Sequence, residues 1–352
     1  MDRRSLLKIL LFGIFSLFSK IKFGWPENRT VAHVIKTNKS SNDISKIVVV
    51  RHPMAMDEKG KARPSIVDDM LNSALVSFTK EDSPIKAWKQ FFTSRDIVGI
   101  KVNSVNQRKG PCTQPALVNA IVRGLVSAGV VENNIIIWDK YEDQLIKAGF
   151  NINKSATGVR CFGTNSRWRI FGKSLRFLQY ELTSSRFGSI ESHLSTILTK
   201  DCTAIINVPV LKDHKLAGIT LSMKNFYGAI DNPSRYHKNN CSPYIADLNM
   251  LPEIRNKLRL IIGDGLRALY HGGPTGSPQW QWNYNGILLG TDPVAIDYVG
   301  WQIIEEKRKK EGLPSLKRER RQPNYINIAA DSEHRLGIND PDRIAIENIQ
   351  MK

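Results

Sequence analysis

Residues 203–228, TAIINVPVLKDHKLAGITLSMKNFYG, join an apolar run to a dense group of polar side chains. The run TAIINV is short and rich in β-branched residues, which is typical of a strand buried on both faces. Three lysines and a histidine follow it, and Asp213 is the one acidic residue among them. Because open α/β sheets bind ligands beyond the carboxyl ends of their strands, this order predicts a functional site within residues 207–230.

Strands and helices alternate on either side of this segment. Apolar runs predict further strands at residues 46–51, 96–102, 134–138, 258–262 and 286–289. Apolar residues at helical spacing predict helices at 65–80, 114–130 and 293–306. This alternation predicts an α/β fold in which a mainly parallel sheet carries helices on both faces. Residues 151–200 show no firm period, and we interpret them as an irregular insertion or small subdomain in the middle of the chain.

The N-terminus has the form of an export signal. The hexapeptide RRSLLK at residues 3–8 matches the twin-arginine pattern, and the apolar run at 9–18 is short for a membrane span but suits a signal peptide. No A-x-A-like cleavage site follows. We therefore predict that residues 1–25 are an export signal or an uncleaved membrane anchor, with an amphipathic N-terminal helix as the alternative.

This signal predicts a periplasmic or otherwise extracytoplasmic protein, membrane-anchored if the segment is retained, with the twin-arginine translocase as a partner. The rest of the chain is predicted to comprise a polar linker at 26–45, an α/β domain at 46–330 and a C-terminal segment at 331–352.

The formal net charge is +18, from 51 basic and 33 acidic residues. Such an excess favours an anionic partner: a phosphorylated or carboxylated small molecule, a phospholipid surface, a cell-wall polymer or nucleic acid. The alternative is that scattered lysines keep the protein soluble. The densest cluster, residues 305–321, mixes eight basic residues with four glutamates and predicts a solvated helix face and loop. No nucleic-acid motif accompanies it, so nucleic acid is the least favoured partner.

Four cysteines occur far apart in the chain: Cys112, Cys161, Cys202 and Cys241. They form no C-x-x-C pair and no iron–sulfur or zinc spacing, so the sequence identifies no cofactor. We expect most of them to be small buried residues, and disulfides stay open.

Four residues of the 207–230 stretch form the candidate catalytic group: Lys212, His214, Lys224 and Asn225. A lysine can hold a phosphate or carboxylate as a point charge, and a desolvated lysine can act as a base or nucleophile. The imidazole of His214 can shuttle a proton or bind a metal. The amide of Asn225 can orient a carbonyl or an oxyanion.

The other strand ends supply candidate ligand-binding residues. Lys101 and Asn103 lie at the end of the predicted strand 96–102, where the lysine can meet an anion or simply be solvated. Asp264 stands between two glycines after the predicted strand 258–262 and suits a metal or hydroxyl ligand. Together with His214, it is the candidate for a metal site.

Two further aspartates follow the strand predicted at 286–289. Asp292 suits the N-cap of the next helix, with Pro293 as its first residue, and this structural role explains both residues. Asp297 lies one turn further along and has no such explanation, so it stays a ligand-binding candidate with Asp292.

Several motifs together resemble the bacterial and archaeal family catalogued as domain of unknown function 362. They are VGIKVN, TQPALVNAIV, IINVPVLKDH, GITLSMKNFYG, IGDGL, GGPTGSP and GILLGTDPVAID. Relatives typically have proline where this chain has Val102, and some carry ferredoxin-like cysteine clusters that this chain lacks. The resemblance covers roughly residues 46–306. It implies that the nine candidate residues are site positions, but it supplies no roles for them.

Three function classes are consistent with these residues. The first is an enzyme acting on an anionic small molecule with a metal or organic cofactor, in which lysines bind the anion and His214 is the acid or base. The second is a non-catalytic extracytoplasmic protein that binds an anionic ligand or a metal. The third is a basic surface for nucleic acid or a membrane.

Overall fold

The computed structural model of this chain describes residues 44–105, 110–170, 173–274 and 276–352, with the backbone alone at 168–170 and 173–174. The predicted export signal and the predicted linker up to residue 43 lie outside these ranges. Within them, no helix has both the length and the apolar character that crossing a membrane requires.

One mixed sheet organises the described chain, with strands in the order β14-β1-β13-β11-β8-β2-β3-β4-β5. Their bounds are β1 Ser45–Arg51, β2 Val98–Val102, β3 Ile135–Tyr141, β4 Arg160–Ile170, β5 Lys173–Leu178, β8 Ala204–Val208, β11 Leu258–Leu269, β13 Gly286–Gly290 and β14 Ile344–Gln350. The pairs β1–β13, β11–β13 and β4–β5 are antiparallel, whereas the other five along this order are parallel. The predicted α/β fold with a mainly parallel sheet is confirmed.

Three short strands join the sheet beside this order: β9 Val210–His214, β10 Gly218–Thr220 and β12 Gln281–Trp282. A separate pair consists of β6 Ser185–Phe187 and β7 Ile190–Ser192. Short helical turns are η2 Glu132–Asn134, η3 Ile197–Asp201, η4 Met223–Ala229, η5 Pro233–His237, η6 Asn239–Cys241, η7 Pro278–Trp280 and η8 Pro341–Arg343.

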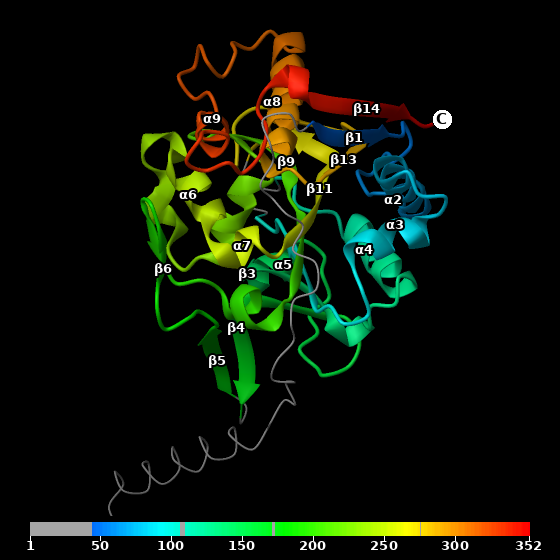
Figure 1. Cartoon of the computed structure of the whole chain (residues 1–352), viewed down its shortest axis with the longest axis vertical. Coiled ribbons are helices and arrows are strands. Elements are labelled where there is room, and N and C mark those ends of the chain that lie inside the picture. Colours follow the sequence, from blue (N-terminus) through cyan, green and yellow to red (C-terminus); the bar gives the residue numbers. More distant parts are fainter. Residues whose placement is uncertain (1–43, 106–109, 171–172, 275) are drawn as a thin grey trace, which may run out of the picture. The chain divides into compact units, whose positions relative to one another are not determined.

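Helices cover both faces of the sheet (Figure 1). On one face lie α2 Pro64–Thr79, α3 Pro84–Phe91, α4 Pro115–Ser127 and α5 Glu142–Lys147; the core of the other face includes α6 Tyr244–Met250, α7 Pro252–Arg255, α8 Pro293–Lys310 and α9 Tyr325–Ala329. Alternate residues of β1 enter opposite cores: Val48 and Val50 pack with the first group, Ile47 and Val49 with the second. Burial on both faces explains why the strands are continuous apolar runs.

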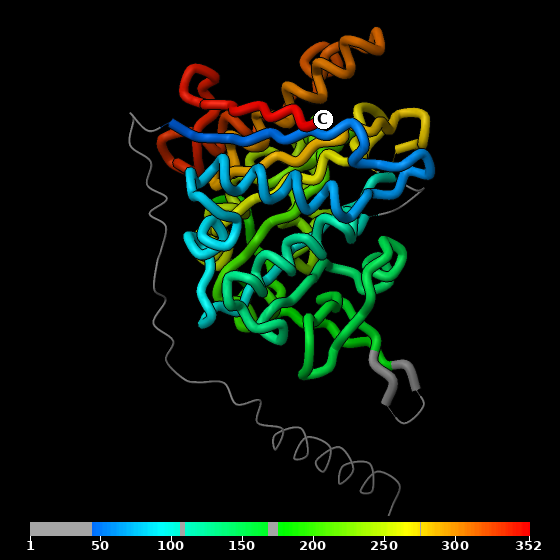
Figure 2. Tube along the Cα trace, turned by 90° about the vertical axis from the view of Figure 1, so that its right-hand side faces the viewer, coloured from blue at the N-terminus to red at the C-terminus, as the bar shows by residue number. Residues whose placement is uncertain are grey.

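The two ends of the described chain meet at one sheet edge. β14 lies beside β1 in parallel, from Ser45 opposite Ile344 to Arg51 opposite Gln350 (Figure 2). Residues 331–352, which the sequence predicts as a separate C-terminal segment, therefore contribute a strand to the main sheet.

The middle segment is more regular than its sequence predicts. β4 extends the main sheet beside β3 and turns back into β5. Its first residues enter both cores, Phe162 one and Cys161 the other, but the polar residues that follow interrupt the apolar pattern. At Gly163 the next backbone segment comes close: a Cβ there would lie 2.4 Å from the Glu142 nitrogen.

The predicted strand end before Asp264 is wrong, because β11 continues to Leu269. Asp264 pairs with Ile287 of β13 inside the sheet. The flanking glycines mark close approach within the strand rather than a turn that ends it: a Cβ at Gly265 would lie 3.1 Å from the carbonyl oxygen of Gly286.

The basic cluster at 305–321 is not wholly a solvated face, in contrast to the prediction. Arg308 is fully buried, donates to the carbonyl oxygens of Pro314 and Tyr270, and forms a 2.7 Å ion pair with Glu319. Arg321 is also buried and pairs with Glu319 and Asp213. Two of the eight basic residues thus hold the chain after α8 against the sheet.

We predict that Arg308→Ala lowers the free energy of unfolding by about 3–5 kcal/mol, because it leaves the carbonyl oxygens of Tyr270 and Pro314 without this donor and removes one of the two arginine partners of Glu319. The neighbouring Lys309→Ala is the control, since Lys309 is exposed and should change stability by less than about 0.5 kcal/mol. Urea unfolding measures both. Equal stabilities for the two variants would contradict the structural role given to Arg308.

Candidate functional site

Strand alternation sorts the KDH motif of β9 onto two faces. Lys212 and His214 line a pocket, whereas Asp213 lies on the other face, where its carboxylate accepts from the Gly273 nitrogen and pairs with Arg321. The charge of Asp213 is therefore balanced by Arg321 on the opposite face of β9 from Lys212 and His214.

Asp297 fixes the start of η4, which carries the second half of the site. Its carboxylate accepts from the backbone nitrogens of Ser222 at 2.6 Å and Met223 at 3.2 Å, and the Tyr325 hydroxyl donates to it at 3.1 Å. Burial raises the pKa of Asp297 to about 7, and these donors oppose that rise. Asp297 thus acts as an anchor for the turn.

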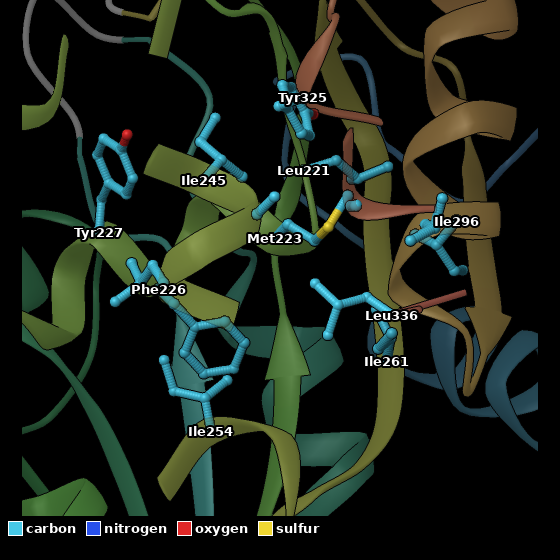
Figure 3. Packing of buried hydrophobic residues seen from close by; sticks show 14 of the residues in the cluster. Leu221, Met223, Phe226, Tyr227, Ile245, Ile254, Ile261, Ile296, Tyr325 and Leu336 are labelled. Carbon is cyan, nitrogen blue, oxygen red and sulfur yellow. The ribbon is translucent and has the colours of Figure 1, made fainter. Parts of the chain in front are cut away.

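Apolar packing orients the same turn. Met223 and Phe226 of η4 enter the core among Ile245, Ile254 and Ile261 (Figure 3). Lys224 and Asn225 lie between these two residues and face the other way. Both are predicted catalytic candidates, and both line the pocket.

A buried ion pair joins the C-terminal parts of β2 and β3. The Lys101 Nζ lies 2.7 Å from Asp139 Oδ1, and Ser104 donates from both its nitrogen and its hydroxyl to Asp139 Oδ2. Gly228 lies directly over this pair, since a Cβ there would be 2.5 Å from Asp139 Oδ1 and 2.7 Å from Lys101 Nζ. The pair is thus sealed on that side by backbone.

A chain of side-chain amides links the strand ends to η4. Lys212 Nζ donates to Asn103 Oδ1 at 2.8 Å, and Asn103 Nδ2 donates to Asn225 Oδ1 at 3.1 Å. Asn225 Nδ2 then donates to Asn207 Oδ1 at 2.8 Å. Lys212 is therefore held by a neutral oxygen rather than by a carboxylate.

These elements surround a pocket of about 190 Å³. Its lining is rich in amines, imidazoles and phenol rings: Asn103, Val105, Asp139, Lys140, Tyr141, Gln144, Lys212, His214, Thr220, Lys224, Asn225, Tyr227, Gly228, Pro233, His237 and Pro274. We call this site the lysine pocket.

The lysine pocket has an excess of positive charge. Lys140, Lys212 and Lys224 line it, and Asp139, the one carboxylate among the described lining residues, is already paired with Lys101. Among the described residues, none of the three lining lysines has an ion-pair partner within 4.0 Å. Burial lowers the pKa of each of these three amines to about 8.

The fold fixes the tautomer of His214. Its Nδ1 accepts from the backbone nitrogens of Leu216 at 3.2 Å and Ala217 at 3.1 Å, so the proton of the neutral ring sits on Nε2. Burial, together with the charge of Lys224, holds the pKa of His214 well below its usual value. His214 is therefore a neutral hydrogen-bond donor.

His237 has the opposite tautomer. Its Nδ1 donates to the carbonyl oxygen of Pro233 at 2.9 Å, which leaves Nε2 as the acceptor for Lys224 Nζ at 3.3 Å. Burial lowers the pKa of His237 to about 4. The Lys224 ammonium also lies 4.3 Å from the ring centre of Tyr227. Lys224 is thus held by a neutral imidazole and an aromatic face.

Besides Lys101 and Asp297, two further predicted ligand-binding residues lie outside the pocket lining, Asp264 and Asp292. Asp264 accepts from the nitrogens of Gln114 and Leu266, and burial raises its pKa to about 7. Asp292 caps α8 by accepting from the nitrogens of Val294 and Ala295, as its sequence position predicts.

Among the nine predicted positions, the structure places five in the lining: Asn103, Lys212, His214, Lys224 and Asn225. Lys101 is not in the lining but forms an ion pair with the lining residue Asp139. Asp297 is not in the lining either, but it binds the backbone at the start of η4. The described ranges contain no group of three or more His, Cys, Asp or Glu side chains that could hold a metal ion. The four cysteines are free and buried, as expected.

Sequence reasoning missed several lining residues. Asp139 and Lys140 directly follow the predicted strand 134–138, so the rule of reading the residues after each strand applies to them as well. His237 gives no such signal, because it comes from a short turn whose position depends on tertiary contacts.

The fold and the site together define an α/β protein with a lysine-lined pocket near the carboxyl ends of its parallel strands. The family described as "Domain of unknown function (DUF362)" matches residues 98–302, and the chain belongs to this family. The matched range contains every residue of the lysine pocket. No curated protein matches the chain.

We predict a pH-dependent difference in stability between the wild type and Lys212→Met. The pKa of Lys212 is about 8 in the folded protein, against 10.5 for an ordinary lysine. Burial of the charge therefore costs stability below pH 8, and this cost disappears as the pH rises toward 10.5. From about pH 7 to about pH 10, the free energy of unfolding of the wild type should rise by about 2–3 kcal/mol relative to that of the variant.

Urea unfolding of both proteins at the two pH values measures this difference, and other titrating groups cancel between them. The exposed neighbour variant Lys215→Met controls for the change in net charge. A difference that stays constant with pH would contradict the desolvation of Lys212.

Proposed function

We propose that this chain binds a small anionic molecule in the lysine pocket and transfers a proton to or from it. One observation carries this proposal: three buried amines line the same pocket and, within the part of the chain that the structure describes, have no carboxylate partner.

The energetics favour an anion as the missing partner. Burial of an ammonium group without a counter-charge costs several kcal/mol. Phosphate or carboxylate oxygens offset this cost, because charge-assisted hydrogen bonds in a desolvated site are the strong ones. The volume of about 190 Å³ is below the range of about 300–1,000 Å³ for drug-sized ligands, so a small metabolite suits the pocket better than a nucleotide.

The same pocket contains the groups that a proton transfer needs. Lys224, with a pKa of about 8, is neutral in about one molecule in ten at pH 7 and is the proton acceptor in this proposal. His214 presents Nε2–H as a fixed donor that can polarise a carbonyl or hold an oxyanion. The proposal thus moves the acid–base role from His214, where the sequence suggests it, to Lys224.

Asn225 takes a positioning role in this proposal. Its Nδ2 donates to Asn207 Oδ1 and to the carbonyl oxygen of Lys101, and its Oδ1 accepts from Asn103. Because these bonds occupy both ends of the amide, Asn225 supports the pocket rather than a ligand oxyanion.

We predict that small oxyanions raise the melting temperature of the wild type, whereas Lys212→Gln and Lys224→Gln weaken this response. Phosphate, phosphorylated three-carbon acids and dicarboxylates are the probes, with chloride at the same ionic strength as the reference. A ligand at a hundredfold excess over its Kd stabilises the folded state by about 2.7 kcal/mol. Loss of one charged contact should weaken binding by about tenfold or more.

Lys215→Gln is the matched control, because it removes the same charge from an exposed position three residues from Lys212 and should respond as the wild type does. An equal response from all three variants would place the anion elsewhere. Binding that survives in every variant, with no proton exchanged, would leave only a non-catalytic surface interaction.

A further inference from the structure

The β4–β5 hairpin lies at one end of the main sheet (Figure 1). The two strands pair from Asn165 opposite Leu178 to Ile170 opposite Lys173. β5 is the last strand in the sheet order, so within the described chain its outer edge has no neighbouring strand.

Large apolar side chains lie on both faces of β5 and just after it, since strand alternation turns Leu175 and Phe177 to one face and Leu178 to the other. Leu175 is 44% exposed, Phe177 40%, Leu178 61% and Leu182 94%. The other large exposed apolar residues of the described ranges do not form such a run, since no other three fall within eight positions of sequence. A local concentration of this kind marks an interaction surface more often than isolated exposed residues do.

Positive charge surrounds these apolar side chains. Arg167 and Arg176 lie opposite each other in the hairpin register, and both are exposed. Residues 160–180 contain five basic residues and no acidic one, Arg160, Arg167, Arg169, Lys173 and Arg176, and the acidic residue that follows them, Glu181, is paired with Lys200. The partner of this surface must therefore be both apolar and anionic.

We propose that this hairpin patch, formed by Arg167, Leu175, Arg176, Phe177, Leu178 and Leu182, docks on an anionic lipid surface. Leucine and phenylalanine side chains enter the interface between headgroups and acyl chains, while arginines meet lipid phosphates. This proposal is independent of the lysine pocket.

The charge pattern argues against the two other partners that such a patch suggests. A second copy, paired antiparallel along β5, would bring together two strands that each contain Lys173 and Arg176 and no acidic residue. Nucleic acid would satisfy the arginines but leave four apolar side chains in water.

Vesicle co-sedimentation of the full chain tests the proposal. The wild type should bind vesicles that contain roughly 30% phosphatidylglycerol in preference to pure phosphatidylcholine. The double variant Phe177→Ser/Leu178→Ser should lose about tenfold in partition, and Arg176→Gln about fivefold. Ile85→Ser/Val131→Ser removes equally exposed apolar groups elsewhere and should stay within about twofold of the wild type.

A local probe separates the hairpin from any other membrane contact of the full chain. A thiol-reactive, environment-sensitive dye on Leu175→Cys should shift its emission to shorter wavelength with anionic vesicles, whereas the same dye on Val131→Cys should not. The four native cysteines are buried, which directs labelling to the introduced thiol.

Two outcomes would overturn the proposal. One is an unchanged emission of the Leu175→Cys label, together with equal vesicle partition of wild type and double variant. The other is binding to duplex DNA that Arg176→Gln weakens and Phe177→Ser/Leu178→Ser does not, which would assign the patch to nucleic acid.

Discussion

The Lys101–Asp139 ion pair determines the electrostatics of the whole site. It joins the ends of β2 and β3 and is sealed by the backbone at Gly228. Because this pair uses the one carboxylate among the described lining residues, the three lysines around the cavity have no ion-pair partner within 4.0 Å in the described chain. A buried pair of this kind contributes little net stability, but here it decides which charges stay available to a ligand.

The two faces of β9 separate two charge systems. On one face, Asp213 is neutralised by Arg321, with Arg308 3.8 Å away. On the other, Lys212 and His214 face a cavity in which hydrogen bonds come from neutral groups. Period-two alternation of the strand thus places an acidic residue directly between two site residues without letting it reach the site. Arg308 and Arg321 thus stabilise β9 on the face that Asp213 occupies, and the face that lines the pocket carries Lys212.

The sequence predicts those parts of the fold and site that depend on local pattern. The strands at 46–51 and 203–208 and the helices at 65–80 and 293–306 are present in the structure, because burial on both faces produces unmistakable apolar runs. Asp292 was recognisable as a helix cap from its position alone.

Features that depend on tertiary contacts could not be predicted in this way. β4 places Gly163 against the Glu142 backbone, and Asp264 lies within a strand that continues past its glycines. His237 reaches the pocket only because its turn packs beside Lys224 and Tyr227. Residue type marked Lys212 and His214 as candidates, but only the backbone donors of Leu216 and Ala217 show which nitrogen of His214 carries the proton.

Proton uptake on anion binding tests the central claim most directly. Isothermal titration calorimetry near pH 8, in buffers of different ionisation enthalpy, counts the protons taken up per bound anion. Because Lys140 and Lys212 have pKa values of about 8, each is about half protonated at pH 8, and a bound anion that raises both pKa values should draw in about one proton. Binding without proton uptake, or uptake that Lys140→Gln and Lys212→Gln leave unchanged, would contradict a pocket of desolvated lysines that binds an anion.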